Sequence, residues 1–363
     1  MGAALDARAH EPRGPGEVRL VDLAPRWRIP LLVLGFVSLA FGVMGGLARL
    51  GPGIPAPLTA LALHGPLMVS AFLGTVIALE RAVAFGRLWA YGAPLCAGLG
   101  GLALLAGLIL PGFALMILAA ATLCAVSGAL VRRQPSLEAW VLLAGAAAWL
   151  AGNVMLGEGR PAVPWWIAFF ALTIGAERLE LSRYLKRPAW AKGAFPVLAA
   201  GMLVTPLFPP LLGVLLFLLA LWLLSFDLAR VTIRQARLPR YVAACLLAGY
   251  FWLAVGGALI AASAAYDAAL HAIFLGFVFS MVFGHAPVIL PAVLRVTFPY
   301  HPVLYLPLAL LHASLAARVM LSTALGAWGN ALAIAVFIVT AAFLVLRDRT
   351  LVDAHQRTPA SPP

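Results

Sequence analysis

Long apolar runs recur along the whole chain and limit what it can fold into. A helix needs about 20 mostly apolar residues to cross a bilayer, and the 363-residue sequence offers about twelve such runs between charged or Pro- and Gly-rich breaks. Only 10% of the residues are charged and 63% are hydrophobic, whereas a soluble domain carries about 25% charged residues. The sequence therefore predicts an all-α, polytopic membrane protein with about 12 transmembrane helices in a bundle. The runs begin near Ile29, Leu58, Leu88, Phe113, Leu137, Val163, Phe195, Pro210, Tyr241, Asp267, Pro302 and Ala327.

The basic residues test this count, because Lys and Arg in short loops stay in the cytoplasm. With twelve spans and a cytoplasmic N-terminus, all of the 25 Lys and Arg residues except Arg49, Arg160 and Arg318 fall on the cytoplasmic side. One helix more or fewer would invert every later loop and destroy this bias. We expect both termini in the cytoplasm, and we expect the net charge of +12 to reflect orientation and contact with membrane lipid headgroups rather than nucleic acid. The predicted regions are an N-terminal tail at 1–28, a transmembrane domain at 29–346 and a C-terminal tail at 347–363.

Several classes of function are disfavoured by what the sequence lacks. No apolar run precedes Ile29, so a cleavable signal peptide is not expected. Cys96, Cys124 and Cys245 are isolated within spans and form no CxxC pair, which favours helix packing over zinc binding. No phosphate loop or dinucleotide fingerprint occurs, and a nucleotide partner is therefore not expected.

A weak internal repeat links the second and sixth spans. Glu80-Arg81 and Glu177-Arg178 lie 97 residues apart, and a further 97 residues leads to Phe274 in the tenth span. Spans 2, 6 and 10 would then head three groups of four helices. The alternative is that both Glu-Arg pairs are ordinary ion pairs at the membrane interface.

Four histidines lie at membrane depth. Ionisable groups there are costly and usually face the interior of a bundle. The structural alternative for each one is a neutral imidazole bonded to a nearby backbone carbonyl or hydroxyl. Because several occur on few helices, we expect a functional cluster made from His64, His271, His285 and His312.

His64 and His271 are predicted to share one layer of the membrane. Both spans run inward from the outer face, and both histidines lie roughly 6 to 9 Å below it at about 1.5 Å rise per residue. Facing imidazoles at one depth can supply both axial ligands of a heme. Asp267 lies four residues before His271 on the same helix face and could orient its ring. The alternative for Asp267 is a solvated acid at a helix N-terminus.

His285 follows His271 by 14 residues, which places it deeper on the same helix face if the helix is regular. A second metal or heme site made from His285 with His312, with His301 as a further candidate ligand, is less well aligned. Proline stands two residues after both His64 and His285, where it frees a helix carbonyl.

Trp165 and Trp166 are expected in an interfacial aromatic belt.

The pattern resembles the subunit I superfamily of heme-copper oxidases, and more closely its NnrS-like branch. The resemblance rests on the twelve-helix topology and on the runs LHGPLMVSAFLGTVIALERAV (residues 63–83) and HAIFLGFVFSMVFGHAPVILPAVLR (residues 271–295). NnrS-like proteins are multi-pass bacterial proteins associated with heme, copper and the nitric oxide response. The resemblance implies a b-type heme held by His64 and His271, with copper as a further candidate cofactor. It also implies a bacterial cytoplasmic membrane location and an electron donor that is a protein or a quinol.

The departures from the superfamily narrow the expected activity. Respiratory oxidases carry copper ligands on helices 6 and 7, and neither span has a histidine here. If the chain is an enzyme, we expect a membrane oxidoreductase and not a conventional oxygen-reducing terminal oxidase. One alternative is a permease or efflux protein without a redox cofactor, supported by membrane carboxylates and by prolines in the seventh span. Another is an assembly partner for a respiratory protein.

Overall fold

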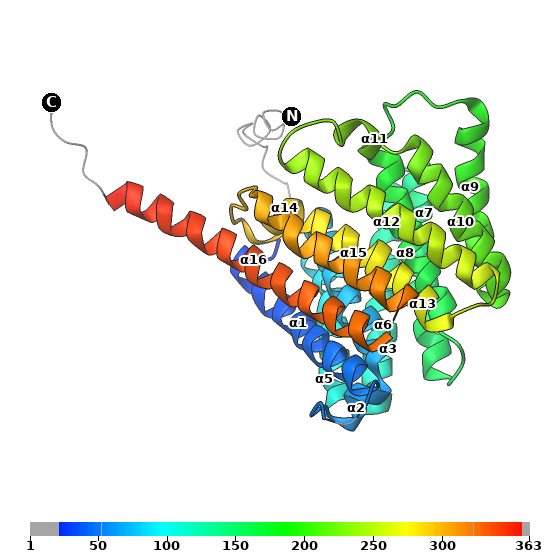
Figure 1. Ribbon diagram of the computed structural model, residues 1–363, viewed down its shortest axis with the longest axis horizontal. Coiled ribbons are helices and arrows are strands. Elements are labelled where there is room, and N and C mark those ends of the chain that lie inside the picture. Colours follow the sequence, from blue (N-terminus) through cyan, green and yellow to red (C-terminus); the bar gives the residue numbers. More distant parts are fainter. Residues whose placement is uncertain (1–21, 52, 322, 358–363) are drawn as a thin grey trace, which may run out of the picture.

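The chain folds into a bundle of long helices (Figure 1). The computed structural model describes residues 22–51, 53–321 and 323–357, and these contain no β-strand. Eleven helical spans within them are long and apolar enough to cross a membrane. We count α8 (Val163–Leu181) as a further span, although it is not among these eleven, because its 19 residues carry charge only near the end, at Glu177, Arg178 and Glu180. The predicted all-α, polytopic architecture is confirmed.

The first six spans fill the sequence up to residue 181. The second span is divided by a break at Leu63, and seven of its residues form the π-helix η1. The elements are α1 (Pro25–Ala48); α2 (Leu58–Ala62), α3 (His64–Pro66), η1 (Leu67–Leu73) and α4 (Gly74–Phe85); η2 (Leu88–Tyr91) and α5 (Gly92–Leu105); α6 (Ile109–Arg133); α7 (Leu137–Gly157); and α8.

The remaining six spans follow the same pattern, and the tenth contains a second π-helix, η4. They are α9 (Ala189–Val204) with η3 (Thr205–Leu207); α10 (Pro209–Phe226) with α11 (Ala229–Thr232); α12 (Leu238–Ala261); α13 (Tyr266–His271), η4 (Ala272–Phe279) and α14 (Ser280–Leu294); η5 (Pro302–Leu304) with α15 (Tyr305–Met320); and α16 (Thr323–Arg357).

Polar contacts at the two ends of α1 identify the two membrane-exposed ends of the bundle. The Arg28 guanidinium at the start of α1 donates to the carbonyl of Val293 at the end of α14, 2.8 Å away. On the opposite face, Arg49 at the end of α1 donates to the carbonyls of Leu61 and Ala62. We call the face with Arg28 the inner face and the face with Arg49 the outer face, after the predicted orientation.

The second, sixth and tenth spans lie at the centre of the bundle. An unbroken run from Trp166 to Ala176 is buried in α8, and η1 and η4 are almost wholly buried. These are the helices that the internal repeat placed in equivalent positions. The predicted division into three groups of four helices stays a prediction.

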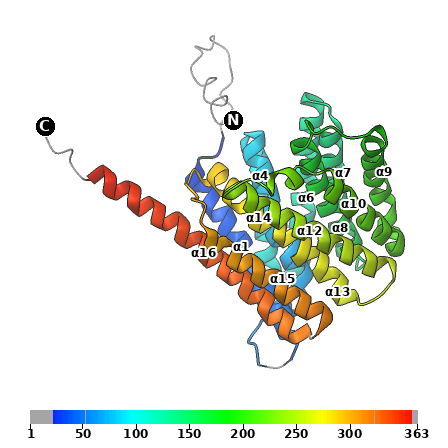
Figure 2. The same ribbon diagram turned by 45° about the horizontal axis from the view of Figure 1, so that its top comes forward.

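Two boundaries differ from those expected. The helix α16 continues past residue 346 to Arg357, so part of the predicted C-terminal tail is helical and projects beyond the other helices (Figure 2). Pro206, Pro209 and Pro210 lie in η3 and at the start of α10. They therefore lie at the end of the seventh span, whereas Pro196 lies inside α9. Residues 1–21 of the predicted N-terminal tail and residues 358–363 lie outside the described residues.

Candidate functional site

His64 and His271 line one cavity in the outer half of the bundle. We call it the outer cavity; its volume is about 450 Å³. Its walls come from α1, the second span, the start of α8, the tenth span, α15 and α16. The structure thus brings together the two imidazoles that the sequence placed at one depth, and Asp267 lines the same cavity.

Both imidazoles are anchored through Nδ1. His64 Nδ1 lies 2.6 Å from the Gly42 carbonyl on α1, and His271 Nδ1 lies 2.7 Å from the Asp267 carbonyl. A carbonyl only accepts hydrogen bonds, so each Nδ1 carries the proton and each Nε2 keeps its lone pair. Within the described part of the chain no hydrogen bond reaches either Nε2. This is the tautomer that a histidine needs to bind a metal through Nε2.

Asp267 connects His271 to α15. Its carboxylate lies 3.3 Å from His271 Nδ1, while Nε and Nη2 of Arg318 donate to its two oxygens at 3.0 Å each. The backbone carbonyl and the carboxylate of one residue thus both face the same ring nitrogen. The carboxylate lies beside the His271 ring, and its role in orienting that ring stays a prediction.

Two arginines complete the mouth of the outer cavity, and sequence reasoning did not include them in the site. Arg49 donates to Leu61 and Ala62 at 2.7 and 3.0 Å. The Ala62 carbonyl lacks its helical partner because Pro66 has no N–H, so Arg49 stabilises the break before His64. Arg318 is the second arginine. Both were exceptions to the positive-inside bias, which is the signal that could have identified them.

Gly46 makes room for the His64 ring. A Cβ atom at this position of α1 would lie 2.7 Å from His64 Cε1 and 2.8 Å from Nδ1. These distances are shorter than real Cβ contacts, so a side chain here would require the His64 ring to shift. The position of His64 therefore depends on a residue on the neighbouring helix.

A buried polar network supports the wall of the outer cavity. Asn153 Oδ1 accepts hydrogen bonds from Ser70 in η1 and from Trp166 Nε1, at 2.6 and 3.1 Å. Trp149 Nε1 donates to Ser70 at 3.1 Å, and Asn153 Nδ2 donates to the Met116 carbonyl at 2.9 Å. The expected interfacial place for Trp166 is wrong, because this side chain is only 2% exposed and lines the cavity.

A second cavity occupies the inner half of the bundle. We call it the inner cavity; its volume is about 550 Å³, and its few polar lining residues include His285, Glu80 and Glu177. Leu73, Phe279 and Ile334 line both cavities, so these three apolar side chains separate them. His285 Nδ1 lies 3.0 Å from the Met281 carbonyl, which again leaves Nε2 as an acceptor.

His312 differs from the other three membrane histidines. Trp252 Nε1 donates to its Nδ1 at 3.0 Å, so the ring proton is on Nε2, which lies 3.3 Å from Ser280 Oγ. Both ring nitrogens therefore have partners, and His312 lines neither cavity. His285 lines the inner cavity and His312 does not, so the two imidazoles do not share a cavity. In the described residues no group of three or more His, Cys, Asp or Glu side chains is arranged to hold a metal ion.

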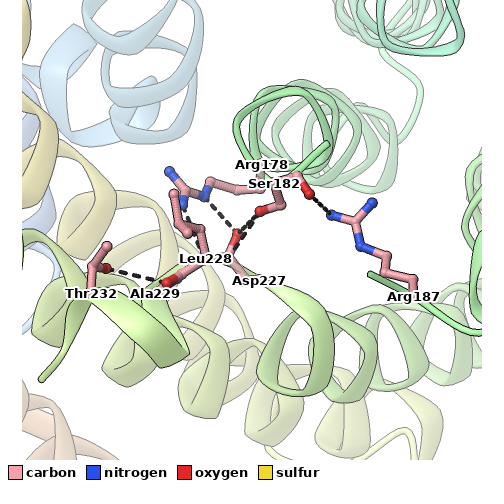
Figure 3. A network of polar contacts seen from close by, with 7 residues as sticks. All are labelled: Arg178, Ser182, Arg187, Asp227, Leu228, Ala229 and Thr232. Carbon is pink, nitrogen blue, oxygen red and sulfur yellow. Dashed lines mark hydrogen bonds and ion pairs between the residues drawn. The ribbon is translucent and has the colours of Figure 1, made fainter. Parts of the chain in front are cut away.

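The two Glu-Arg pairs separate in the structure. Arg81 on α4 pairs with Glu177 on α8, whereas Arg178 forms a two-point ion pair with Asp227 at 2.9 and 3.0 Å (Figure 3). Asp227 is 1% exposed and also accepts from Ser182 and from the Ala229 amide. This buried network fastens the end of α8 to the junction of α10 and α11. It is a structural cluster outside both cavities.

A family model described as "Domain of unknown function (DUF8744)" matches residues 28–346. The chain belongs to this family. No curated protein and no solved structure matches it. The DUF8744 match extends from the first turn of α1 into α16, and it therefore includes both cavities and every histidine discussed above.

Proposed function

We propose that this DUF8744 protein is a multi-pass protein of the bacterial cytoplasmic membrane that binds a b-type heme in the outer cavity, where His64 and His271 would hold it. The resemblance to NnrS-like proteins favours a redox role linked to the nitric oxide response. A bound heme supplies one-electron chemistry at its iron. The heme proposal rests on the observation that the two imidazoles line one cavity and that both keep Nε2 available.

The cavity and its charges fit such a ligand. Cofactor sites measure about 300 to 1,000 Å³ and are mostly apolar, and the outer cavity of about 450 Å³ falls within this range. Arg49 and Arg318 outnumber Asp267, which pairs with Arg318, so net positive charge remains at the mouth and favours the carboxylates of a heme. His64 and His271 come from different helices, so a bound heme would join the second span to the tenth. Because both ring nitrogens of His312 are bonded, we propose no copper site at His285 and His312.

Optical spectroscopy of the purified protein tests the proposal. After heme-replete expression, we expect the wild type to show a Soret band and the spectrum of a low-spin heme with two imidazole ligands. His64→Ala and His271→Ala should each abolish that low-spin spectrum. His301→Ala should retain it, because His301 lies outside the cavities and only accepts from the Val303 amide. A folded wild-type protein without a Soret band would overturn the proposal.

A permease is the second candidate function, and one observation supports it. The two cavities lie in opposite halves of the bundle and share Leu73, Phe279 and Ile334 in their linings. A site reached alternately from each face needs side chains that form a barrier at such a position. Substrate-dependent flux in proteoliposomes by a protein that binds no heme would favour this function.

A further inference from the structure

The inner cavity meets the surface of the bundle along α1 and α16. These helices lie side by side at one edge of the bundle in both views (Figures 1 and 2). Some residues that line the cavity are also exposed at this edge: Ile29 is 49% exposed, Phe36 39% and Leu346 60%. Exposed apolar side chains on a membrane-spanning helix face acyl chains. A lipophilic molecule in the inner leaflet can therefore reach the cavity sideways.

Aromatic rings form much of the wall of the inner cavity. The Phe72 ring contacts those of Phe36 and Phe279, with centroid distances of 5.7 and 5.9 Å. Phe283 and Phe337 stack at 3.9 Å and line the same cavity. The faces of aromatic rings attract cations, including quaternary ions that donate no hydrogen bond. The volume of about 550 Å³ lies within the range of about 300 to 1,000 Å³ that is typical of small-molecule sites.

Glu80 places an acidic group without a counter-ion in this aromatic cavity. Glu80 and Glu177 line the cavity, whereas no Lys or Arg of the described residues does. Arg81 pairs with Glu177, and Arg178 pairs with Asp227. Within the described part of the chain Glu80 makes no hydrogen bond or ion pair. An ionised carboxylate at membrane depth is costly when it lacks a partner, so a positive charge beside Glu80 would be stabilising.

The remaining polar groups of the lining do not select a ligand by hydrogen bonding. The Thr173 hydroxyl can donate or accept, and so can a neutral Glu80 carboxyl. His285 Nδ1 faces the Met281 carbonyl and leaves an Nε2 lone pair. Charge is therefore the property that discriminates between ligands. An anion would meet Glu80 without a basic partner, whereas a cation supplies the missing counter-charge.

We propose that the inner cavity binds lipophilic organic cations, in which a permanent positive charge is carried on an apolar, aromatic body. The positive centre lies beside the ionised Glu80 carboxylate, and the body packs against the phenylalanine rings. Any proton held by Glu80 in the empty cavity leaves for the aqueous phase when the cation binds. Anionic headgroups of a cytoplasmic leaflet would concentrate such ions at the entrance. The site is independent of heme in the outer cavity, and it gives the permease candidate a substrate class.

Equilibrium dialysis of the full-length protein in non-ionic detergent tests the proposal. The probes are tetraphenylphosphonium and tetraphenylborate, which have similar shapes and opposite charges, and each is titrated separately against protein-free detergent. We expect saturable binding of the cation, and binding of the anion that is weaker by about tenfold or more. Glu80→Gln should weaken cation binding about tenfold or more, because a charge–charge attraction is lost, and should not weaken anion binding. Glu180→Gln is the matched control, since Glu180 is exposed on α8 and lies outside the cavity.

A second pair of variants tests the aromatic wall without changing any charge. Phe337→Leu should weaken binding of tetraphenylphosphonium about 2- to 10-fold, because a cation–π contact is lost. Phe343→Leu is the control on the same helix, since Phe343 is 59% exposed and lies outside the cavity.

Three results would overturn the proposal: no saturable binding of tetraphenylphosphonium, equally tight binding of tetraphenylborate, or wild-type cation affinity in the folded Glu80→Gln variant. A heme Soret band without cation binding would overturn only this proposal. Cation binding without a Soret band would overturn only the heme proposal.

Discussion

Arg318 holds Asp267 through both of its carboxylate oxygens, with N–O distances of 3.0 Å, at the mouth of the outer cavity. The same carboxylate lies 3.3 Å from His271 Nδ1. The Asp267 side chain is about half exposed, and an exposed ion pair contributes little to folding. Its main effect should therefore be on His271.

Asp267→Asn should weaken heme binding. The backbone carbonyl still accepts from His271 Nδ1, but the charged partner is lost, and removal of such orienting groups typically costs about 10- to 100-fold in affinity. Heme titration of the apoprotein measures the effect. Glu158→Gln is the control, because Glu158 is an outer-face acid paired with Arg160 outside the cavity. Equal heme affinities for wild type and Asp267→Asn would contradict the orienting role.

Gly46→Ala should displace the His64 ring and abolish the low-spin heme spectrum. The added Cβ would lie 2.7 Å from His64 Cε1. Gly128→Ala on α6 is the matched control, since nothing lies within 4 Å of a Cβ there and alanine favours a helix over glycine by about 1 kcal/mol. The comparison is made on spectra of both folded variants. A normal spectrum for Gly46→Ala would show that His64 does not need this space.

His312→Phe should reduce stability without reducing heme content. The change leaves the Trp252 N–H without its acceptor, and an unsatisfied buried group costs about 1 to 3 kcal/mol. Thermal unfolding in detergent and the heme-to-protein ratio are measured on one preparation. Loss of heme from a protein that remains folded would instead make His312 part of the cofactor site.

Asp227→Leu should be the most destabilising of these changes. It leaves Arg178 buried without a counter-charge, which costs about 3 to 5 kcal/mol. The double variant Arg178→Met, Asp227→Leu should recover part of this loss, because neither charge then remains buried. The prediction is tested by comparing the unfolding midpoints of Asp227→Leu, the double variant and the control variant Glu180→Gln. A double variant less stable than Asp227→Leu would argue against a simple charge pair.

The positions of the spans could be predicted because a membrane span must be a long apolar run, and such runs are visible in the sequence. Val163 was placed at the true start of α8, and Ile29 and Phe113 lie within four residues of the starts of α1 and α6. The end of α16 could not be predicted, because polar residues after 346 are compatible with either helix or tail. Trp166 was misplaced because an aromatic residue near a helix end suits both an interface and a packed core.

The site was predictable only in part, for a physical reason. Depth along a helix follows from residue count, which placed His64 and His271 in one layer. Hydrogen bonding at Nδ1 depends on carbonyls of other turns and helices, and it separates His312 from the cavity histidines. The rotation expected between His271 and His285 assumed a regular α-helix, whereas η4 lies between them.

The two π-helices set how the residues of the inner cavity face relative to the outer histidines. Such segments are typically one-residue insertions into an α-helix, and one inserted residue turns everything beyond it by about 100°. The segment η1 lies between His64 and Glu80, and η4 lies between His271 and His285. The wider turn of a π-helix offsets this rotation, so the extra residue is accommodated while both flanking α-helices keep their faces. If η4 became a regular α-helix of the same length, His271 would stay in the outer cavity while His285 would turn away from the inner one. The facing of the inner cavity's polar groups therefore depends on the backbone hydrogen bonding of two short segments.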